Sequence, residues 1–553
     1  MKKLMMLSCA CALMSSTALA RWVFKFPEGE TTAYWDDAAR WTNDGGTHAV
    51  PTGSDCICEQ SGTIFITNTV PYVWEFRLNA STNGTPLMLQ FKPDATNNHE
   101  WSSLVMGQDA GKGGMVQIDA GATYSGGLTV GRSGSGIVTN LGTVYYGNEI
   151  VLGEKAGSWG RLVCCDGGTV RYRWAKDLYV GRKGRGELLV RNSTFDWYYW
   201  SAKNGDVVVG ESSAGGVITL ETNSLFKVQM TYLGGRDAGA AGVGEIRLRG
   251  GTFVNNKDNW TVENGMTNHV DNLRMGTCPT AEGGVDAASR GVIRGWGRIV
   301  GNNVSRTGVR GIRAALGYGE IVGDGEGDES HVLDTCEALY TVSNALPADV
   351  AAETTSGWRA VNKGLVELPN RSCFWNGSTW NGLVAYPGCA KERGVDNLLP
   401  DLVNAVRIRA SGTTPGYDKC FSVAVLAPDR ADAYTNALPA GCNVLSVHRM
   451  GVFNNPSYRD TAHRVSFSTA NVAIRYDQTK ILKPNTRLEL WRYSVAAGKW
   501  TRLVGLEAGE RPAGKVIAMA DDAGLTDDLD EVYNIGTFAV VEREVNGTVF
   551  LLR

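Results

Sequence analysis

Short apolar runs that end in glycine recur along the first half of the chain. The runs LVMG at 104–107 and LTVG at 128–131 are two of the six copies. The closing glycines are Gly107, Gly131, Gly153, Gly181, Gly210 and Gly234, separated by 24, 22, 28, 29 and 24 residues. Such a recurring spacing predicts a repeat architecture in which each unit packs on its neighbours.

Two further phases follow these glycines. Five to ten residues later comes a glycine with alternating apolar residues, as in GELLV at 186–190. A third phase, such as GTV at 142–144 and GTF at 251–253, begins another extended run. Period-two alternation broken by glycine predicts three short strands per repeat. Three strands in roughly 25 residues indicate one coil of a parallel β-solenoid, whereas a β-propeller blade has four strands in about 40–45 residues.

The rest of the chain departs from this pattern on both sides. Trp35 and Trp41 lie in an aromatic-rich stretch that suits a cap over the open end of a solenoid. After about residue 300 the period blurs, and beyond residue 401 longer alternating strands indicate an antiparallel sandwich. The predicted segments are a signal peptide at 1–20, a cap at 21–60, regular coils at 61–300, an irregular continuation at 301–400 and a sandwich at 401–553. The predicted fold class is therefore all-β, a right-handed parallel β-solenoid (β-helix) followed by a C-terminal antiparallel β-sandwich.

The first twenty residues fit a secretory signal peptide. Lys2 and Lys3 precede an apolar run at 4–14, and the small-x-small sequence ALA at 18–20 fits a cleavage site. The run is shorter than the roughly 20 residues that span a membrane. We therefore expect the mature chain to begin at Arg21, to be secreted or displayed at the cell surface, and not to be a transmembrane protein.

Ten cysteines follow the leader at wide spacings that do not resemble a zinc site. An even number outside the cytosol permits disulfides. Buried free thiols are one expectation. The alternative is disulfide formation, for which Cys420 and Cys442 are the favoured pair because both lie in one β-rich region.

Composition narrows the function classes. The chain of 553 residues has 69 Gly, too many for a helical protein, yet 43% of its residues are hydrophobic and 16 are Trp, which excludes a disordered chain. The net charge is -3 and no basic run is present, so no nucleic-acid partner is expected.

The repeat phrases L-x-V-G, G-x-L-x-V and G-G-T-V resemble the passenger repeats of autotransporter-type secreted β-helix proteins. The aromatic opening at 35–55 is similar to the start of many such passengers, and GWRAVNKG at 357–364 and LAPDRAD at 426–432 resemble segments of functionally uncharacterised secreted families. The resemblance implies architecture rather than activity, because β-helices include adhesins, lyases and inert stalks. In contrast to that family, no run of ten-residue membrane-barrel strands follows the repeats, so self-translocation is not expected.

One acidic stretch is a candidate metal site. Asp324, Glu326 and Asp328 alternate with glycine, and their carboxylates could bind Ca²⁺. The EF-hand pattern is not met, because Thr335 stands where the bidentate Glu belongs, and an acidic surface turn is the alternative. No other cofactor is expected. No nucleophile, zinc or phosphate-binding motif is recognisable in the sequence, so we predict a protein without hydrolytic or lyase activity.

The third phase also provides candidate ligand-binding residues. If Val144, Val170, Phe195 and Phe226 face inward, alternation places their neighbours outward in a ladder along one wall. The predicted ligand-binding residues on this wall are Tyr145, Arg171, Arg173, Asp196, Tyr198 and Trp200. Aromatic rings and hydrogen-bonding groups in a row suit sugar rings and their hydroxyls. The alternative is that the aromatic run at 197–200 packs beneath a loop.

These observations favour a secreted or cell-surface structural or adhesive β-solenoid that contacts glycans or other cell-surface components. A β-helix polysaccharide lyase or glycoside hydrolase is one alternative, and an inert display stalk is another.

Overall fold

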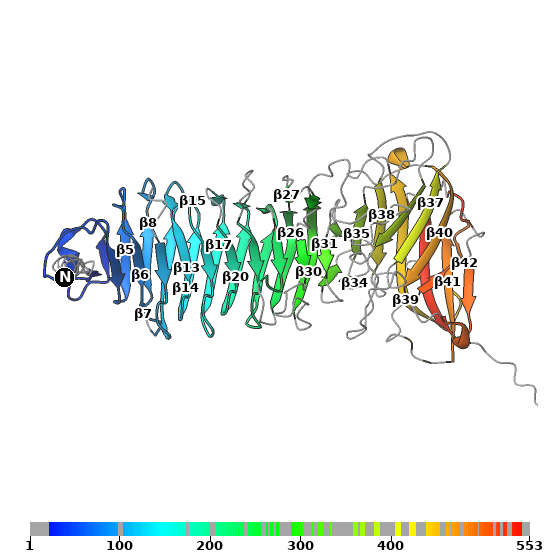
Figure 1. The fold of residues 1–553 in the computed structure, drawn as a ribbon, viewed down its shortest axis with the longest axis horizontal. Coiled ribbons are helices and arrows are strands. Elements are labelled where there is room, and N and C mark those ends of the chain that lie inside the picture. The colour runs from blue at the N-terminus through cyan, green and yellow to red at the C-terminus, as the bar shows by residue number, and fades with distance from the viewer. Residues whose placement is uncertain are drawn as a thin grey trace, which may run out of the picture.

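A computed structural model shows an elongated stack of parallel strands that ends in a wider antiparallel domain (Figure 1). It describes residues 21–83, 85–97, 103–172, 176–197, 205–228, 230–236 and 242–255 continuously, and between 261 and 544 chiefly the strands named below. The predicted signal peptide lies outside the described residues. The predicted all-β class, with a parallel solenoid and antiparallel sheets at the C-terminal end, is confirmed.

The first phase of the repeat forms one parallel sheet, here called the first face. Its strands are β1 (Trp22–Phe24), β4 (Asp55–Cys58), β6 (Glu75–Leu78), β10 (Ser103–Met106), β13 (Gly127–Val130), β16 (Ile150–Leu152), β19 (Leu178–Val180), β22 (Val207–Val209), β25 (Thr231–Leu233), β29 (Leu273–Met275) and β31 (Ile312–Ala314). Each strand pairs in parallel with the strand of the next coil.

The second phase forms the second face in the same way. Its strands are β2 (Thr32–Tyr34), β5 (Gly62–Ile66), β8 (Leu87–Phe91), β11 (Lys112–Ile118), β14 (Ser135–Asn140), β17 (Trp159–Cys165), β20 (Arg185–Arg191), β23 (Gly216–Glu221), β26 (Val243–Asn255), β30 (Arg290–Gly301), β32 (Gly319–Gly323) and β34 (Trp358–Asn362). The short β7 (Ala80–Ser81) pairs antiparallel with β11.

The third phase forms the third face. Its strands are β9 (Thr96–Asn97), β12 (Thr123–Ser125), β15 (Thr143–Tyr146), β18 (Thr169–Tyr172), β21 (Thr194–Trp197), β24 (Leu225–Val228), the later halves of β26 and β30, β33 (Val332–Asp334) and β35 (Leu365–Asn370). A hairpin of β27 (Thr261–Glu263) and β28 (Met266–Asn268) stands apart from the three faces.

The interior of the solenoid is built from like side chains stacked in successive coils. Phe195, Phe226 and Phe253 are fully buried on the third face. Their ring centroids are 5.1 Å apart in the first pair and 5.9 Å in the second. Stacking of this kind follows from the parallel register, which brings equivalent positions about 4.8 Å apart. No single coil buries its own apolar face, so each depends on its neighbours.

The N-terminal end of the stack is closed by an antiparallel strand. β3 (Trp41–Asn43) follows the 3₁₀ helix η1 (Ala38–Arg40) and pairs antiparallel with β1. Trp41, the first residue of β3, packs edge to face against Trp35 with ring centroids 4.6 Å apart, and its ring centroid lies 5.0 Å from that of Phe24. Residues 21–60, expected to form a cap, thus provide β1, β2 and β4 of the parallel stack together with the strand that covers its edge.

Two antiparallel sheets form the C-terminal domain. One sheet continues from β35 through β38 (Cys420–Leu426), β39 (Cys442–Phe453), β44 (Gly536–Arg543), β41 (Arg487–Ser494) and β42 (Lys499–Leu506). The other contains β36 (Asn381–Tyr386), β37 (Asn404–Ala410), β40 (Phe467–Arg475) and β43 (Val516–Ala518). The 3₁₀ helices η4 (Thr461–His463) and η6 (Ala508–Glu510) lie between strands. Met450 and Phe538 of the first sheet share one buried cluster with Val472 and Ile517 of the second.

The predicted disulfide between Cys420 and Cys442 is wrong, because Cys442 carries a free thiol. The antiparallel register explains this outcome. Cys420 pairs with Phe453 at one end of the 12-residue strand β39, and Cys442 is the first residue at the other end. The two positions are roughly 35 Å apart at about 3.3 Å per residue, whereas a disulfide requires Cα atoms within about 7 Å.

The expectation of buried free thiols is confirmed for Cys56, Cys58 and Cys164. Burial raises the pKa of Cys58 and of Cys164 to about 12. Both therefore remain neutral, weakly reactive thiols at physiological pH.

Candidate functional site

The third face carries the predicted outward row. Tyr145 lies opposite Arg171, Arg171 opposite Asp196, and Asp196 opposite Lys227 on successive strands. The inward partners predicted for these positions, Val144, Val170, Phe195 and Phe226, are fully buried. We call Tyr145, Arg171, Asp196 and Lys227 the polar row. Its charges alternate in sign, so it presents no strong net field.

A second row of side chains, missed in the sequence, runs beside the polar row. Thr96 pairs with Thr123, Thr123 with Thr143, Thr143 with Thr169 and Thr169 with Thr194. All five are half-buried on the outer surface. The ladder extends one step further toward the N-terminus through Thr69. We call Thr69, Thr96, Thr123, Thr143, Thr169 and Thr194 the threonine ladder.

Hydroxyl groups contact one another along this ladder. The Thr169 hydroxyl donates to the Thr143 hydroxyl at 3.3 Å, and the Oγ1 atoms of Thr69 and Thr96 are 2.9 Å apart. A hydroxyl both donates and accepts, so each rung can bond a neighbour and an external group. The signal was present in the sequence, because threonine recurs at the second position of the third phase at 143, 169 and 194.

The structure describes only part of the predicted site. Arg173, Tyr198 and Trp200 lie outside the described residues, as do the candidate Ca²⁺ ligands Asp324, Glu326 and Asp328. Trp197, the first residue of the aromatic run, points inward and is only 1% exposed. Its ring lies 5.7 Å from that of Tyr146. Trp197 therefore belongs to the core rather than to the outer wall.

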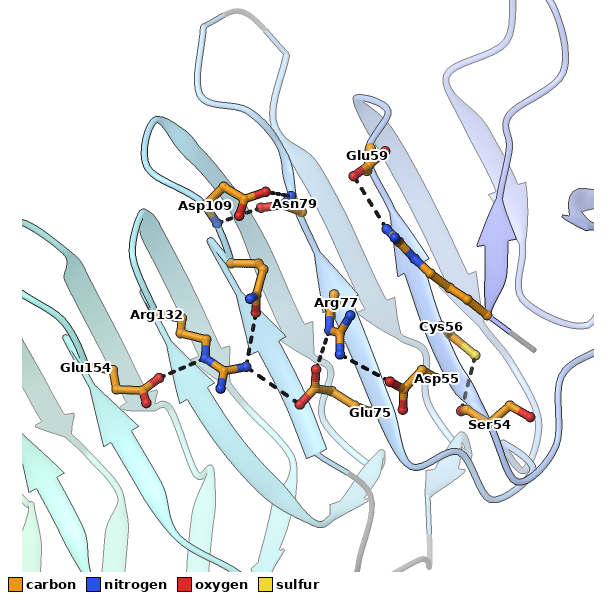
Figure 2. Close-up of polar contacts among 12 residues, drawn as sticks. Ser54, Asp55, Cys56, Glu59, Glu75, Arg77, Asn79, Asp109, Arg132 and Glu154 are labelled. Atoms are coloured by element: carbon orange, nitrogen blue, oxygen red, sulfur yellow. Dashed lines mark hydrogen bonds and ion pairs between the residues drawn. The ribbon is translucent and has the colours of Figure 1, made fainter. Parts of the chain in front are cut away.

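On the first face, charged side chains form ion pairs with one another. Figure 2 shows Arg77 between Glu75 and Asp55, with Arg132 reaching both Glu75 and Glu154. The Arg132 Nη1 to Glu75 Oε2 distance is 3.9 Å, and Arg132 Nε lies 3.3 Å from Glu154 Oε2. The Arg77–Asp55 pair and the two pairs of Arg132 link side chains of different coils along the solenoid axis.

The same arrangement recurs along the first face every second coil. Arg182 lies 3.5 Å from Glu149 and 3.7 Å from Glu211. Arg236 then reaches Asp177 at 2.8 Å and Asp206 at 2.9 Å. The residues after the strand-closing glycines alternate accordingly, in the order Gln108, Arg132, Glu154, Arg182 and Glu211.

Arg182 and Arg236 each form ion pairs with acidic side chains of other coils, and we call them the crossing arginines. They lie over apolar side chains that point out of the solenoid. Val151, Tyr179 and Val208 form a small buried cluster separate from the main core. The Arg182 guanidinium lies 4.3 Å from the centre of the Tyr179 ring, and Arg236 donates to the Tyr179 hydroxyl at 2.6 Å. The stems and guanidinium groups thus shield these apolar groups from water. In these coils the outer surface of the first face is covered by its own arginine side chains.

The outward positions of the second face differ again in chemistry. Met88 pairs with Met115, which pairs with Ile137, so one outward row there is apolar. Each of the three side chains is half-buried. Among the described residues, a row of threonines that continues over several coils is found on the third face.

Two features are absent from the described part of the chain. No cluster of three or more His, Cys, Asp or Glu side chains suited to a metal ion is found there. Within the same residues, no helix is long and apolar enough to cross a membrane.

The fold is a parallel β-solenoid joined to an antiparallel sandwich, and the third face of the solenoid carries the polar row and the threonine ladder. Comparison with family models, with curated proteins and with solved structures finds no match.

Proposed function

We propose that this is a secreted or cell-surface structural and adhesive protein whose third face contacts glycan chains lying along the solenoid axis. The observation that carries the proposal is the threonine ladder, a line of hydroxyls that lies beside the polar row. Sugar hydroxyls donate and accept hydrogen bonds, as threonine does. The Tyr145 ring, in register with Arg171, offers a surface for a sugar ring.

The charges of the polar row favour a neutral glycan. Asp196 stands between Arg171 and Lys227, so a polyanion would meet a carboxylate between two cations. Like charges that meet at close range are unfavourable. Neutral chains meet no such penalty and can use the same groups as hydrogen-bond partners.

The rest of the molecule supports a structural role. The stack holds the C-terminal sandwich at one end and the aromatic-packed N-terminal coils at the other (Figure 1). Ion pairs link its coils along the first face. A stiff solenoid of this kind would present an extended binding wall, or would act as a stalk that holds the sandwich away from a surface.

Replacing both Thr143 and Thr169 with valine is expected to weaken glycan binding by roughly 5- to 150-fold. Two hydroxyls are lost, each worth about 0.5–1.5 kcal/mol as a hydrogen-bonding group, while the side-chain volume is kept. The thermal midpoint should stay close to that of the wild type, because both side chains are on the surface. The measurement is a glycan array with the mature protein, followed by titration of the glycans that bind.

Thr219→Val is the matched control. Thr219 points outward on the second face, between Leu189 and Arg247 of the neighbouring coils, so its loss should leave binding unchanged. Equal binding by the double variant and the wild type would contradict the proposed wall. Failure of the wild type to bind any glycan on the array would favour the inert stalk.

The enzyme alternative is tested with the same preparation. We expect no release of new reducing ends or unsaturated products from common polysaccharides. Release of such products, lost on changing Asp324 or Asp328 to alanine, would favour a polysaccharide lyase or glycoside hydrolase.

A further inference from the structure

The second face carries a patch of outward side chains at its middle, on strands β17 and β20. In the sheet register Arg161 lies opposite Glu187, and Val163 lies opposite Leu189. All four side chains are half-buried, and we call them the central patch. Apolar side chains gathered on an open sheet face mark an interaction surface. A partner that covers this patch must also match its two charges.

The strands on either side continue the central patch in the same way. An aliphatic side chain stands in line with the charged pair, and a threonine stands in line with the apolar pair. These residues are Ile137 and Thr139 of β14 and Val217 and Thr219 of β23. The kinds of residue are therefore the same in both directions from the middle. An interface between two identical copies needs this property, because each contact of one residue with another occurs twice.

A two-fold axis parallel to the strands, between β17 and β20, brings complementary groups together. β17 of one copy then lies on β20 of the other. Arg161 of each copy faces Glu187 of the other, and Val163 of each copy faces Leu189 of the other. Opposite charges meet across such a contact, which favours this pairing over others.

A further pair on the same two strands obeys the same symmetry. Trp159 of β17 lies opposite Arg185 of β20. Arg185 pairs with Glu187 of its own chain at 2.7 Å, yet its side chain is 65% exposed. About the same axis, Arg185 of each copy would lie over the Trp159 ring of the other. Indole is the aromatic ring that attracts a guanidinium most strongly.

Other arrangements of the same two faces bring unlike groups together. Moving the axis by half a strand spacing places Arg161 on Arg161 or Glu187 on Glu187. An axis parallel to the solenoid instead places Arg161 against Val163 and Glu187 against Leu189. Like charges at close range are unfavourable, and so is a charge that is covered by an apolar group. The sequence of the face thus selects the antiparallel arrangement centred between β17 and β20.

This axis also divides the second face equally. Six strands from β2 to β17 lie on one side of it, and six strands from β20 to β34 lie on the other. Each of these strands therefore has a counterpart in the second copy. The wider sandwich follows the last coils (Figure 1), so in the pair it would extend past the N-terminal end of the other copy.

The six strands nearest the axis, β11 to β26, give a contact area. They span roughly 29 Å at about 4.8 Å each, and the six residues of β14 or β23 span roughly 20 Å. Two such faces cover roughly 1,200 Å² in total, which is the lower end of the range for specific interfaces. An area of this size predicts a reversible dimer.

We propose that two copies of this protein associate through their second faces, antiparallel, about a two-fold axis between β17 and β20. The first and third faces lie outside the contact. The dimer therefore does not depend on the proposed glycan contact, and it leaves the threonine ladder of both copies exposed to solvent.

Complementary charge reversal tests the pairing directly. We expect the mature wild type to dimerise with a Kd on the order of 1–10 µM in sedimentation velocity. In Arg161→Glu two carboxylates would meet across the axis, and in Glu187→Arg two guanidinium groups would meet. Each variant alone should dimerise at least tenfold more weakly. An equimolar mixture of the two variants should regain near wild-type affinity, because every charge then meets its opposite.

Arg40→Glu is the matched control. It also breaks an ion pair within the chain, the one with Asp37 at 2.8 Å, but it lies outside the second face. It should dimerise like the wild type. Circular dichroism of each variant establishes that it is folded. Arg161→Glu/Glu187→Arg restores the ion pair within the chain as well as across the axis, so it should dimerise even where a single variant folds poorly.

Three results would overturn the proposal. The first is a wild type that stays monomeric at about 100 µM, where a dimer with a Kd of about 10 µM would be mostly assembled; the second face would then serve another partner or none. The second is a pair of folded single variants that dimerise as tightly as Arg40→Glu, which would place the contact elsewhere on the molecule. The third is a mixture of the two variants, or a double variant, that is folded and monomeric.

Discussion

Replacing Gly210 with alanine is expected to lower the free energy of unfolding of the solenoid by roughly 4 kcal/mol or more, a loss at the far end of the usual range for one substitution. Gly210 closes β22 with a φ of +66°, and a Cβ atom there would lie 1.6 Å from the Val243 carbonyl oxygen. The obstacle is backbone of the next coil, which cannot rotate away. Relief of the clash would therefore require separating the two coils.

Gly181 is expected to behave in the same way, since its added Cβ would lie 2.2 Å from the Gly215 carbonyl oxygen. Valine at either position should be at least as damaging as alanine. The measurement is chemical denaturation followed by far-ultraviolet circular dichroism.

Gly157→Ala is the control for the backbone conformation alone. Gly157 has a φ of +79°, yet nothing lies within 4 Å of its added Cβ. Its replacement should cost about 1 kcal/mol, the strain of a left-handed residue. If Gly157→Ala and Gly210→Ala lowered the free energy of unfolding equally, the claim that glycine at 210 is needed for close stacking of the coils would be contradicted.

The second large effect is acid destabilisation of the sandwich through His448. His448 is fully buried between Val425 of β38 and Phe538 of β44 in the sheet register, and burial lowers its pKa to about 3 from the ordinary value of 6.5. The unfolded chain therefore binds a proton between pH 6.5 and about 3 that the folded chain does not. The contribution of neutral His448 to the free energy of unfolding is fully present above pH 6.5. It is lost as the pH falls, and the loss reaches about 3 kcal/mol at pH 4.

The check is denaturation of the wild type and of His448→Phe at pH 7 and pH 4, followed by tryptophan fluorescence. The variant should lose about 3 kcal/mol less than the wild type between these pH values. His48→Gln is the control, because His48 is exposed and lies in the N-terminal region rather than in the sandwich. Identical acid sensitivity in His448→Phe and the wild type would contradict a buried neutral imidazole.

The alternation and the glycine spacing were sufficient to predict the solenoid and the inward side chains of the third phase. The reason is that each coil repeats the same local pattern, so local rules decide which residues are buried. The crossing arginines were not predicted, because Arg236 and Asp177 are 59 residues apart in the sequence. Only the stacking of whole coils brings such residues together.

The sandwich shows more clearly what could not be predicted from the sequence. The sequence favours a Cys420–Cys442 pair because both residues lie in one β-rich region, but strand order and register place them at opposite ends of β39. The threonine ladder could have been found, since it follows from the same register that predicted the polar row.

The dependence of affinity on glycan length tests the central claim most directly, because the claim is that a chain lies along the solenoid axis. The threonine ladder spans five strand spacings, or roughly 24 Å at about 4.8 Å each. For a glycan that binds on the array, affinity should rise from the disaccharide upward and level off once the chain covers this length. In Thr143→Val/Thr169→Val the rise should be largely lost. An affinity that is the same for the disaccharide and the longest chain would contradict the account.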